Sequence, residues 1–185
     1  AFDVKFTNKE GKLNYVWATS WGVSSRLMGA LIMTHSDDKG LVLPPKLAPI
    51  QVVIVPIYNG EQELDSISKI AEDIQSKLNK LGVSVKYDNR DTLRPGAKFA
   101  QHELQGVPIR IAIGPKDLKN KSVEVSRRDL LSKENVKMDD LIEHIDNLLS
   151  DIQENLFKKA LKFREDHITQ VESFDEFEEV LNKKG

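Results

Sequence analysis

The alternation of hydrophobic and polar positions divides this chain into a short first part and a longer part in which strands and helices alternate. Residues 1–18 alternate apolar with polar side chains on either side of a turn, which predicts a β-hairpin. Apolar residues at helical spacing over 23–33 predict a helix that Thr19 or Ser20 caps. Three prolines follow within 44–49, and we place a domain boundary after residue 48.

The pattern after residue 48 predicts an α/β fold. Its expected elements are strand 50–57, helix 61–81, strand 83–87, helix 96–104, strand 108–113, strand 122–126, helix 139–164 and helix 173–181. Gly82 suits the end of the helix before it, Ser173 suits the start of the last helix, and residues 114–119 are expected to form a turn. Because strands alternate with helices, we expect a mixed sheet flanked by helices.

The composition excludes several classes of site. The chain has 185 residues and no cysteine, so disulfide frameworks, cysteine-ligated zinc and thiol catalysis are excluded. No apolar run reaches the roughly 18 residues that a membrane span needs. The four histidines are scattered without the spacing of metal ligands, so we expect no metal site. For Asp37 and Asp38 we expect a solvated turn rather than a cation site.

The charges are distributed unevenly along the chain. The formal net charge of -2, taken alone, argues mildly against a nucleic-acid partner. However, residues 86–133 hold 11 basic and 6 acidic side chains, a net charge of +5. Residues 134–185 hold 7 basic and 14 acidic side chains, a net charge of -7. The average therefore conceals a basic middle followed by an acidic tail.

Residues 19–26 are the first candidate for chemistry. A predicted strand ends there, small hydroxyl residues and Gly22 follow, and a helix begins with Arg26 one turn in. Free N–H groups at a helix start favour anions, and a guanidinium can bind a phosphate through two hydrogen bonds. The alternative interpretation is that Arg26 is an exposed helical side chain and that Trp21 packs in the core.

The second candidate lies in the basic middle of the chain. Phe99 and Glu103 are four residues apart on a predicted helix, so they project from one face of it. Arg110 follows on a strand, and Lys116 and Asp117 lie on the turn after it. These groups suit single-stranded RNA, whose splayed bases stack on aromatic rings and are read along their edges by charged groups. The alternative is that Phe99 is a core residue and the charges form a solvated rim.

Both candidates belong to longer runs that resemble one family, the prolyl-tRNA synthetases of the type found in archaea, the eukaryotic cytosol and some bacteria. Its motif 3 and the following linker resemble residues 20–26 (SWGVSSR) and 34–45 (THSDDKGLVLPP). Its anticodon-binding domain resembles four later runs, RPGAKF at 94–99, GVPIR at 106–110, GPKDL at 114–118 and REDH at 164–167. The likeness covers essentially the whole chain.

The resemblance implies a class II aminoacyl-tRNA synthetase. Such an enzyme joins proline to ATP with Mg²⁺ and then transfers the prolyl group to tRNA-Pro. The resemblance further implies that the enzyme is a homodimer in the cytoplasm. In the family the motif 3 arginine grips ATP, and the matching residue here is Arg26. By the same resemblance, Ser20, Trp21 and Gly22 would form part of the wall of the proline and adenylate pocket.

The resemblance also implies which residues read the guanines of the tRNA anticodon. The matching positions are Phe99, Glu103, Arg110, Lys116 and Asp117. Phe99 would stack on or pack against a base. Glu103 and Asp117 could accept hydrogen bonds from guanine N1 and N2, while Arg110 and Lys116 could donate to guanine acceptors or to phosphate.

The departures from the family pattern determine what we expect of this chain alone. Motif 1, motif 2 and the cysteines of the family's C-terminal zinc-binding-like domain are not found. We therefore expect residues 1–48 to be the end of a partial α+β catalytic domain with its linker, and residues 49–185 to be the anticodon-binding domain with C-terminal helices. Such a piece would recognise the anticodon without catalysing the reaction. The alternative is a non-catalytic accessory protein that uses the same fold to bind protein or RNA.

Overall fold

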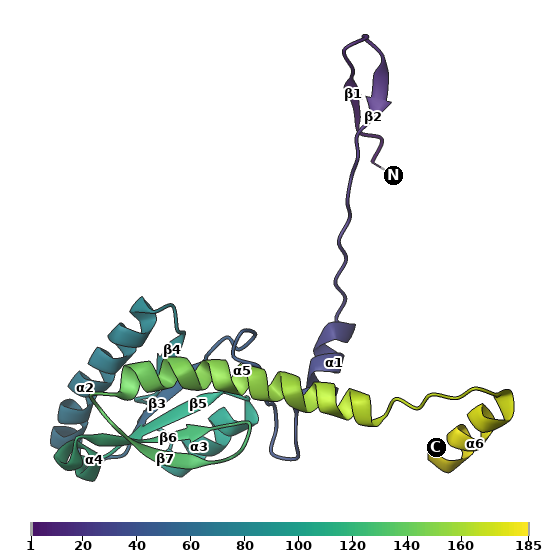
Figure 1. Cartoon of the computed structure of the whole chain (residues 1–185). Helices are drawn as coiled ribbons and strands as arrows, with labels where there is room; N and C mark the ends of the chain where they lie inside the picture. Colours follow the sequence, from purple (N-terminus) through teal and green to yellow (C-terminus); the bar gives the residue numbers. More distant parts are fainter. Residues whose placement is uncertain (1, 185) are drawn as a thin grey trace. The chain divides into compact units, whose positions relative to one another are not determined.

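A computed structural model describes residues 2–184 of the chain, which divides into two compact units (Figure 1). The first unit ends at Ala30 and the second begins at Leu31. This division falls before the boundary that the sequence predicts after residue 48.

The first unit contains the predicted hairpin. Strand β1 (Lys5–Thr7) pairs with β2 (Leu13–Tyr15) in antiparallel register. The side-chain oxygen of Asn8 accepts hydrogen bonds from the backbone N–H groups of Glu10 and Lys12, both at 2.9 Å, which closes the turn. The hairpin prediction is therefore confirmed.

Helix α1 (Arg26–His35) begins later than predicted. The first N–H groups of the helix donate to the carbonyls of Ser24 and Ser25, not to those of Thr19 or Ser20. The predicted cap is therefore wrong, because Ser24 and Ser25 offer the same hydroxyl chemistry directly before the apolar positions that give the helix its period. The residues between β2 and this helix have no regular secondary structure.

The second unit is built on a five-stranded mixed sheet in the order β4-β3-β5-β6-β7. The strands are β3 (Val52–Pro56), β4 (Val85–Tyr87), β5 (Ile109–Ile113), β6 (Ser122–Arg127) and β7 (Lys133–Lys137). The three strands β4, β3 and β5 are parallel, and β6 and β7 continue the sheet in antiparallel pairing. The predicted mixed sheet is confirmed, and β7 is an addition to the strands that the sequence predicted.

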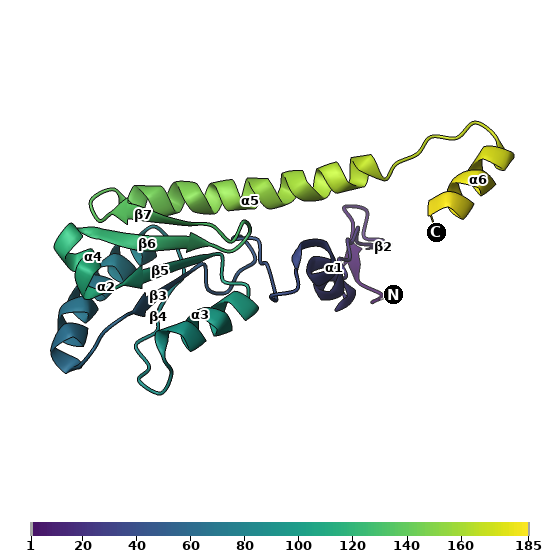
Figure 2. The ribbon, with the colours of Figure 1, turned by 90° about the horizontal axis from the view of Figure 1, so that it is seen from below.

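Helices cover both faces of this sheet, as Figure 1 and the turned view in Figure 2 show. One face packs with α2 (Glu61–Lys80) and α5 (Leu141–Asp166) around a large apolar core. The other face packs with α3 (Pro95–Leu104) through a smaller cluster made by Val53, Val55, Val107 and Phe99. The side of the sheet that carries α3 therefore has less apolar cover than the side that carries α5.

Two shorter helices complete the unit. The expected turn at 114–119 is instead helix α4 (Pro115–Asn120), because Pro115 has a φ that suits a first helical turn and the carboxylate of Asp117 accepts a hydrogen bond from the backbone N–H of Gly114. Helix α6 (Phe174–Lys184) begins as predicted, with the hydroxyl of Ser173 accepting from the N–H of Glu176 at 3.2 Å. None of the helices within residues 2–184 is long and apolar enough to cross a membrane.

The segment before β3 belongs to the fold of the second unit. The N–H of Leu41 donates to the carbonyl of Leu104 at 3.0 Å, and the N–H of Leu43 donates to the carbonyl of Gly106 at 3.3 Å. Val42, which lies between them, is buried in the large core. These bonds run along the end of α3 and bring the segment next to the pocket described below.

Candidate nucleic-acid interface

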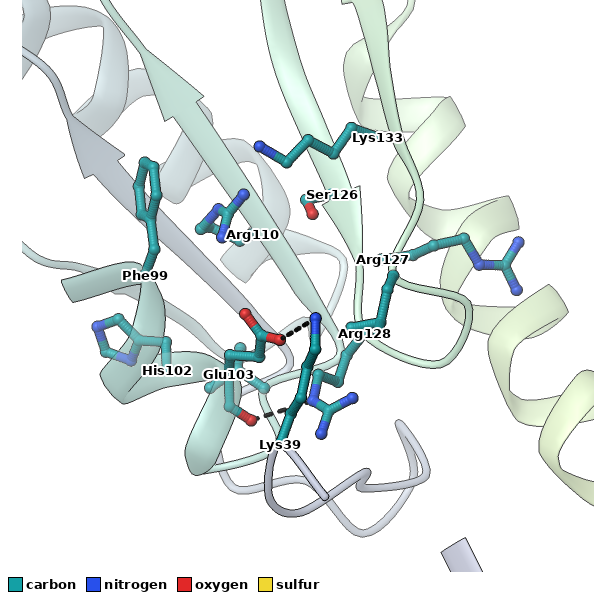
Figure 3. A pocket seen from close by; sticks show the side chains of 11 residues that line it. Lys39, Phe99, His102, Glu103, Arg110, Ser126, Arg127, Arg128 and Lys133 are labelled. Atoms are coloured by element: carbon teal, nitrogen blue, oxygen red, sulfur yellow. Dashed lines mark hydrogen bonds and ion pairs between the residues drawn. The ribbon is translucent and has the colours of Figure 1, made fainter. Parts of the chain in front are cut away.

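A pocket of about 140 Å³ opens on the face of the sheet that carries α3 (Figure 3). Its walls come from the segment before β3, from α3, and from strands β5, β6 and β7 with the turn that joins the last two. The lining residues are Lys39, Phe99, His102, Glu103, Val107, Arg110, Ser126, Arg127, Arg128, Leu131 and Lys133. Five of these residues are basic and one is acidic. Although Arg127 and Arg128 pair with carboxylates outside the lining, the remaining cations leave the pocket suited to an anionic or hydrogen-bond-accepting ligand; they are Lys39, Arg110 and Lys133.

Phe99 and Arg110 form a stacked pair in the pocket. The guanidinium carbon of Arg110 lies 3.9 Å from the centre of the Phe99 ring, and the ring also packs against the small apolar cluster beneath α3. This is a cation–π contact, which holds both side chains in place. The aromatic and the cation that the sequence singled out are therefore in direct contact.

The guanidinium of Arg110 is poorly satisfied for a side chain that is only 12% exposed. One terminal nitrogen lies 3.4 Å from Oε1 of Glu124, and the buried Nε atom has no hydrogen-bond partner. Most buried polar atoms in proteins have such a partner. The buried Nε is out of reach of a ligand, and the weakly bonded terminal end of the guanidinium leaves donor capacity for a ligand that accepts hydrogen bonds.

Glu103 lies one helical turn after Phe99, on the same face of α3 (Figure 3). The helix starts at Pro95, which follows an extended Arg94, and it stops before Gly106, whose φ of +74° lies in the left-handed region. A side chain at Gly106 would collide with Leu41, because an added Cβ atom would lie 2.7 Å from the Cβ of Leu41. The sequence thus fixes where α3 ends and how it presents Glu103.

The inner side of α3 is anchored by the buried carboxylate of Asp88, directly after β4. Arg90 donates two hydrogen bonds of 2.7 Å to this carboxylate, and Nε2 of His102 lies 2.7 Å from it. Lys98 is also buried, and its ammonium group donates to the carbonyl oxygen of Asp88 at 3.0 Å. Arg90 first, and then His102, hold the pKa of the Asp88 carboxyl well below its usual range.

Arg128 joins the end of α3 to the segment before β3. Its guanidinium makes two hydrogen bonds to the Asp37 carboxylate, at 2.6 and 2.7 Å, and its Nε donates to the backbone carbonyl of Glu103 at 3.0 Å. This pairing lowers the pKa of Asp37 to about 2. The predicted exposed turn is present, and what the sequence did not reveal is that the Asp37 carboxylate pairs across it with the buried Arg128.

The structure brings only some of the predicted RNA-reading residues together. Phe99, Glu103 and Arg110 line one pocket. Lys116 and Asp117 lie on α4, past the carboxyl end of β5, and do not line it. One oxygen of Asp117 already accepts the hydrogen bond from the Gly114 N–H at 2.8 Å, so its first role in this structure is to cap the helix.

The residues predicted to bind ATP lie in the first unit. Ser20, Trp21 and Gly22 belong to the irregular segment that precedes α1, and Arg26 is the first residue of that helix. The side chain of Trp21 is exposed, contrary to the alternative that it packs in the core. These four residues do not line the pocket described above.

Sequence reasoning missed the residues that β6, β7 and the preceding segment contribute to the pocket. Arg128 directly follows β6, and Lys133 begins β7. The signal that could have found them is the group of basic residues at the end of the predicted strand 122–126, which follows the strand that carries Arg110. Arg127 lines the pocket but points away from it in Figure 3, pairing with Asp129 and Asp151. Within residues 2–184, no three His, Asp or Glu side chains are grouped so that they could hold a metal ion.

Comparison with known proteins identifies what this part of the chain is similar to. The family model described as "Anticodon binding domain" matches residues 51–148, somewhat more than half of the chain. A curated protein named proline–tRNA ligase from Christiangramia forsetii is 63% identical over 185 residues, which is 100% of this chain and 38% of the relative. Another proline–tRNA ligase, from Flavobacterium psychrophilum, is 60% identical over 185 residues, which is again 100% of this chain and 38% of the relative.

The solved structures give the same picture. A prolyl-tRNA synthetase from Cryptosporidium parvum, crystallised with L-proline and AMP, superposes with a TM-score of 0.83 at 39% identity. The match covers 99% of this chain and 39% of that one. The chain therefore spans about 38% of the length of the curated relatives that it matches.

Proposed function

The chain belongs to the anticodon-binding domain family, and from that premise we propose that it is the anticodon-recognising part of a proline–tRNA ligase, a class II aminoacyl-tRNA synthetase. The identity of 63% to a proline–tRNA ligase along the whole chain supports this assignment over the alternative of an accessory protein. In this proposal residues 49–185 recognise the tRNA, and residues 1–48 belong to the catalytic domain and its linker.

The observation that carries the proposal is the stacked pair of Phe99 and Arg110 beside the carboxylate of Glu103. A base that enters the pocket meets the guanidinium that already covers the Phe99 ring, and it stacks on this pair rather than on the bare ring. The ionised carboxylate of Glu103 only accepts hydrogen bonds. Guanine offers two adjacent donors, N1–H and the N2 amino group, so it is the base that this arrangement favours.

Arg110 contributes a second reading contact. Its unpartnered Nε and its weakly bonded terminal nitrogen are donors on a side chain that has already lost most of its contact with water. The terminal nitrogens would donate to an acceptor of the bound nucleotide, either on the base or on its phosphate, because the Nε atom itself is buried. In this proposal the exposed Lys116 and the cap residue Asp117 belong to a separate contact with the anticodon loop, because they lie outside the pocket.

The ATP-dependent reaction belongs in this proposal to the longer ligase. That enzyme would use ATP with Mg²⁺ to activate proline, charge tRNA-Pro and act as a homodimer in the cytoplasm. Arg26 would grip ATP, and Ser20, Trp21 and Gly22 would line the adenylate site. In the described chain these residues form an exposed segment and not a pocket, so other residues must complete that site, and we expect no aminoacylation by these residues alone.

The test is a binding titration of the full chain with RNA hairpins. One hairpin carries the tRNA-Pro anticodon, and in the others each anticodon guanine is replaced in turn by adenine. We expect tighter binding to the guanine hairpin, because adenine places an acceptor where Glu103 needs a donor. Equal affinities for all hairpins at physiological salt would contradict the proposal, since binding would then depend on phosphates alone.

A further inference from the structure

We infer that Lys39 is a further specificity-determining residue of the pocket, donating a hydrogen bond to the O6 carbonyl of the guanine whose N1 and N2 atoms donate to Glu103. This inference rests on the proposed function. Lys39 lies outside the matched anticodon-binding region, which begins at residue 51. The segment before the domain would therefore supply part of its base-reading site.

The ammonium group of Lys39 lies directly beside the Glu103 carboxylate. Its Nζ is 3.7 Å from Oε1 of Glu103, and Figure 3 shows the lysine running beside Arg128 with its ammonium next to the Glu103 carboxylate. The lysine is 60% exposed and the glutamate 29%, so both remain accessible to a ligand. A donor-only group and an acceptor-only group therefore stand side by side at the place where a base would enter.

The backbone around Lys39 is held rigidly against α3. Its N–H donates to Oδ1 of Asp37 at 2.9 Å, and Asp37 and Gly40 exchange two backbone hydrogen bonds of 3.1 Å. Gly40 has a φ of +131° and packs so closely that an added Cβ atom would lie 2.7 Å from the Cα of Leu104. Any other residue at position 40 would collide with the backbone of Leu104, so the close packing of this turn on the end of α3 requires glycine.

Arg128 sets the distance between the two charged groups. One buried guanidinium binds the Asp37 carboxylate, two residues before Lys39, and also the backbone carbonyl of Glu103 itself. A bidentate contact of this kind fixes orientation as well as distance. The backbones that carry Lys39 and Glu103 are thus tied to the same side chain before any ligand arrives.

The order of these groups matches the edge of guanine. Along its Watson–Crick edge guanine presents the O6 acceptor next to the N1 and N2 donors, so an ammonium beside a carboxylate satisfies all three groups. Adenine presents an amino donor at position 6 and an acceptor at N1, which would face the ammonium and the carboxylate with the wrong polarity. Lys39 would therefore strengthen the preference for guanine over adenine that Glu103 provides. Its effect would not be limited to a general attraction for phosphate.

The experiment compares the full chain with the variants Lys39→Met and Lys69→Met. Lys69 is exposed on α2, which covers the other face of the sheet, so its replacement removes the same charge far from the pocket. Each protein is titrated with hairpins that carry guanosine, inosine or 6-thioguanosine at each anticodon guanine in turn. Inosine lacks the N2 amino group that Glu103 would bind, and 6-thioguanosine replaces O6 by a weaker acceptor.

We expect the unchanged chain and Lys69→Met to bind guanosine several-fold more tightly than 6-thioguanosine at one position. Lys39→Met should bind these two hairpins equally while it keeps the preference for guanosine over inosine, because Glu103 is intact. Lys39→Arg, which retains a donor, should restore part of the preference over 6-thioguanosine.

Two results would overturn the role of Lys39. One is a Lys39→Met variant that still prefers guanosine over 6-thioguanosine, and the other is an unchanged chain that has no such preference at any position. Failure of the proposed function looks different, because the unchanged chain would then fail to distinguish guanosine from inosine or adenosine at all.

Discussion

At the scale of single residues, two of the three arginines that line the pocket, Arg128 and Arg110, have different tasks. All the contacts of Arg128 are made within the protein, to Asp37 and to the carbonyl of Glu103. Arg110 has one long contact to Glu124 and a buried Nε without a partner. Hydrogen-bond accounting thus separates an arginine that holds the site together from one that is available to a ligand.

Replacing Arg110 by alanine should reduce base discrimination more than it reduces stability. We expect the preference for the guanine hairpin over an adenine hairpin to fall by about 1–3 kcal/mol, because a two-donor contact to the nucleotide is lost. Fluorescence titration of both hairpins measures this difference. Arg164→Ala serves as the control, since that arginine is exposed on α5 and makes only a 3.7 Å ion pair with Glu165. A uniform loss of affinity for both hairpins would assign Arg110 to phosphate binding instead.

The ion pair of Asp37 and Arg128 should make part of the stability depend on pH. Because Arg128 lowers the pKa of Asp37 from 3.8 to about 2, the pair stabilises the folded state fully above pH 4 and progressively less as the pH falls toward 2. Urea denaturation of the chain and of Asp37→Asn at several pH values tests this. The stability difference between the two proteins should shrink over that pH window. A difference that stays constant down to pH 2 would show that the carboxylate charge is not involved.

At the scale of elements, helix α3 is the part that presents the site, and the carboxylate of Asp88 holds it from behind. Lys98 and His102 reach that residue from the inner side of the helix, next to the positions of Phe99 and Glu103. A buried charge network of this kind is expensive to disrupt, since each remaining charge is left without a partner. The position of Phe99 and Glu103, the residues proposed to read the base, therefore depends on side chains on the opposite side of the helix.

Replacing Asp88 by asparagine should destabilise the second unit by about 3 kcal/mol, because the change leaves the buried Lys98 ammonium and the buried His102 without the negative charge of the carboxylate. Thermal or urea denaturation measures the loss. RNA binding should weaken as well at a temperature where the variant is still folded. A neutral variant with unchanged RNA affinity would show that α3 is held by its apolar contacts alone.

The long periodic elements and most of the short strands were predictable from the sequence, whereas β7 and α4 were not. The apolar run of β3 and the stripes of α2 and α5 gave strong patterns. Strand β7 has a single buried residue, Val136, so it offers no alternation to detect. The pair Gly114-Pro115, where α4 begins, resembles a turn, although a proline followed by a capping aspartate also starts a helix.

The candidate site was predictable to a similar extent. The spacing of Phe99 and Glu103 placed them on one helix face, and Arg110 on the next strand was within reach. The contact between Asp37 and Arg128 joins residues 91 positions apart, and no local pattern encodes such a pairing. Lys39 stood in a run that the family resemblance covered, but its place beside Glu103 depends on that long-range contact.

At the scale of the whole molecule, the uneven charge has a spatial counterpart in the second unit. The pocket on the α3 face draws its cations mainly from the basic middle of the sequence, while α5 on the opposite face belongs to the acidic tail. An RNA approaching this unit is attracted to one face of the sheet and repelled from the other. The small formal net charge of the chain hides this asymmetry.

Binding of the anticodon hairpin should therefore weaken steeply as salt rises, with a logarithmic slope set by the number of phosphate contacts. Lys133→Ala should lower the magnitude of this slope by about one, because Lys133 is exposed at the pocket and makes only an ion pair with Glu124. Affinities measured at four or five salt concentrations give the slope. An unchanged slope in the variant would place the phosphate-binding cations elsewhere on this face.

The bonds of residues 37–43 to the end of α3 have a consequence for the modularity of this domain. The matched family region begins at residue 51, yet Val42 fills the core and Asp37 neutralises the buried Arg128. A domain excised at residue 49, or grafted onto another protein from there, would carry an open hole and an unpaired cation. The shortest part of this chain that keeps the pocket intact when it is transferred therefore starts at or before Asp37. That start lies within residues 1–48, which the predicted boundary assigns to the preceding domain.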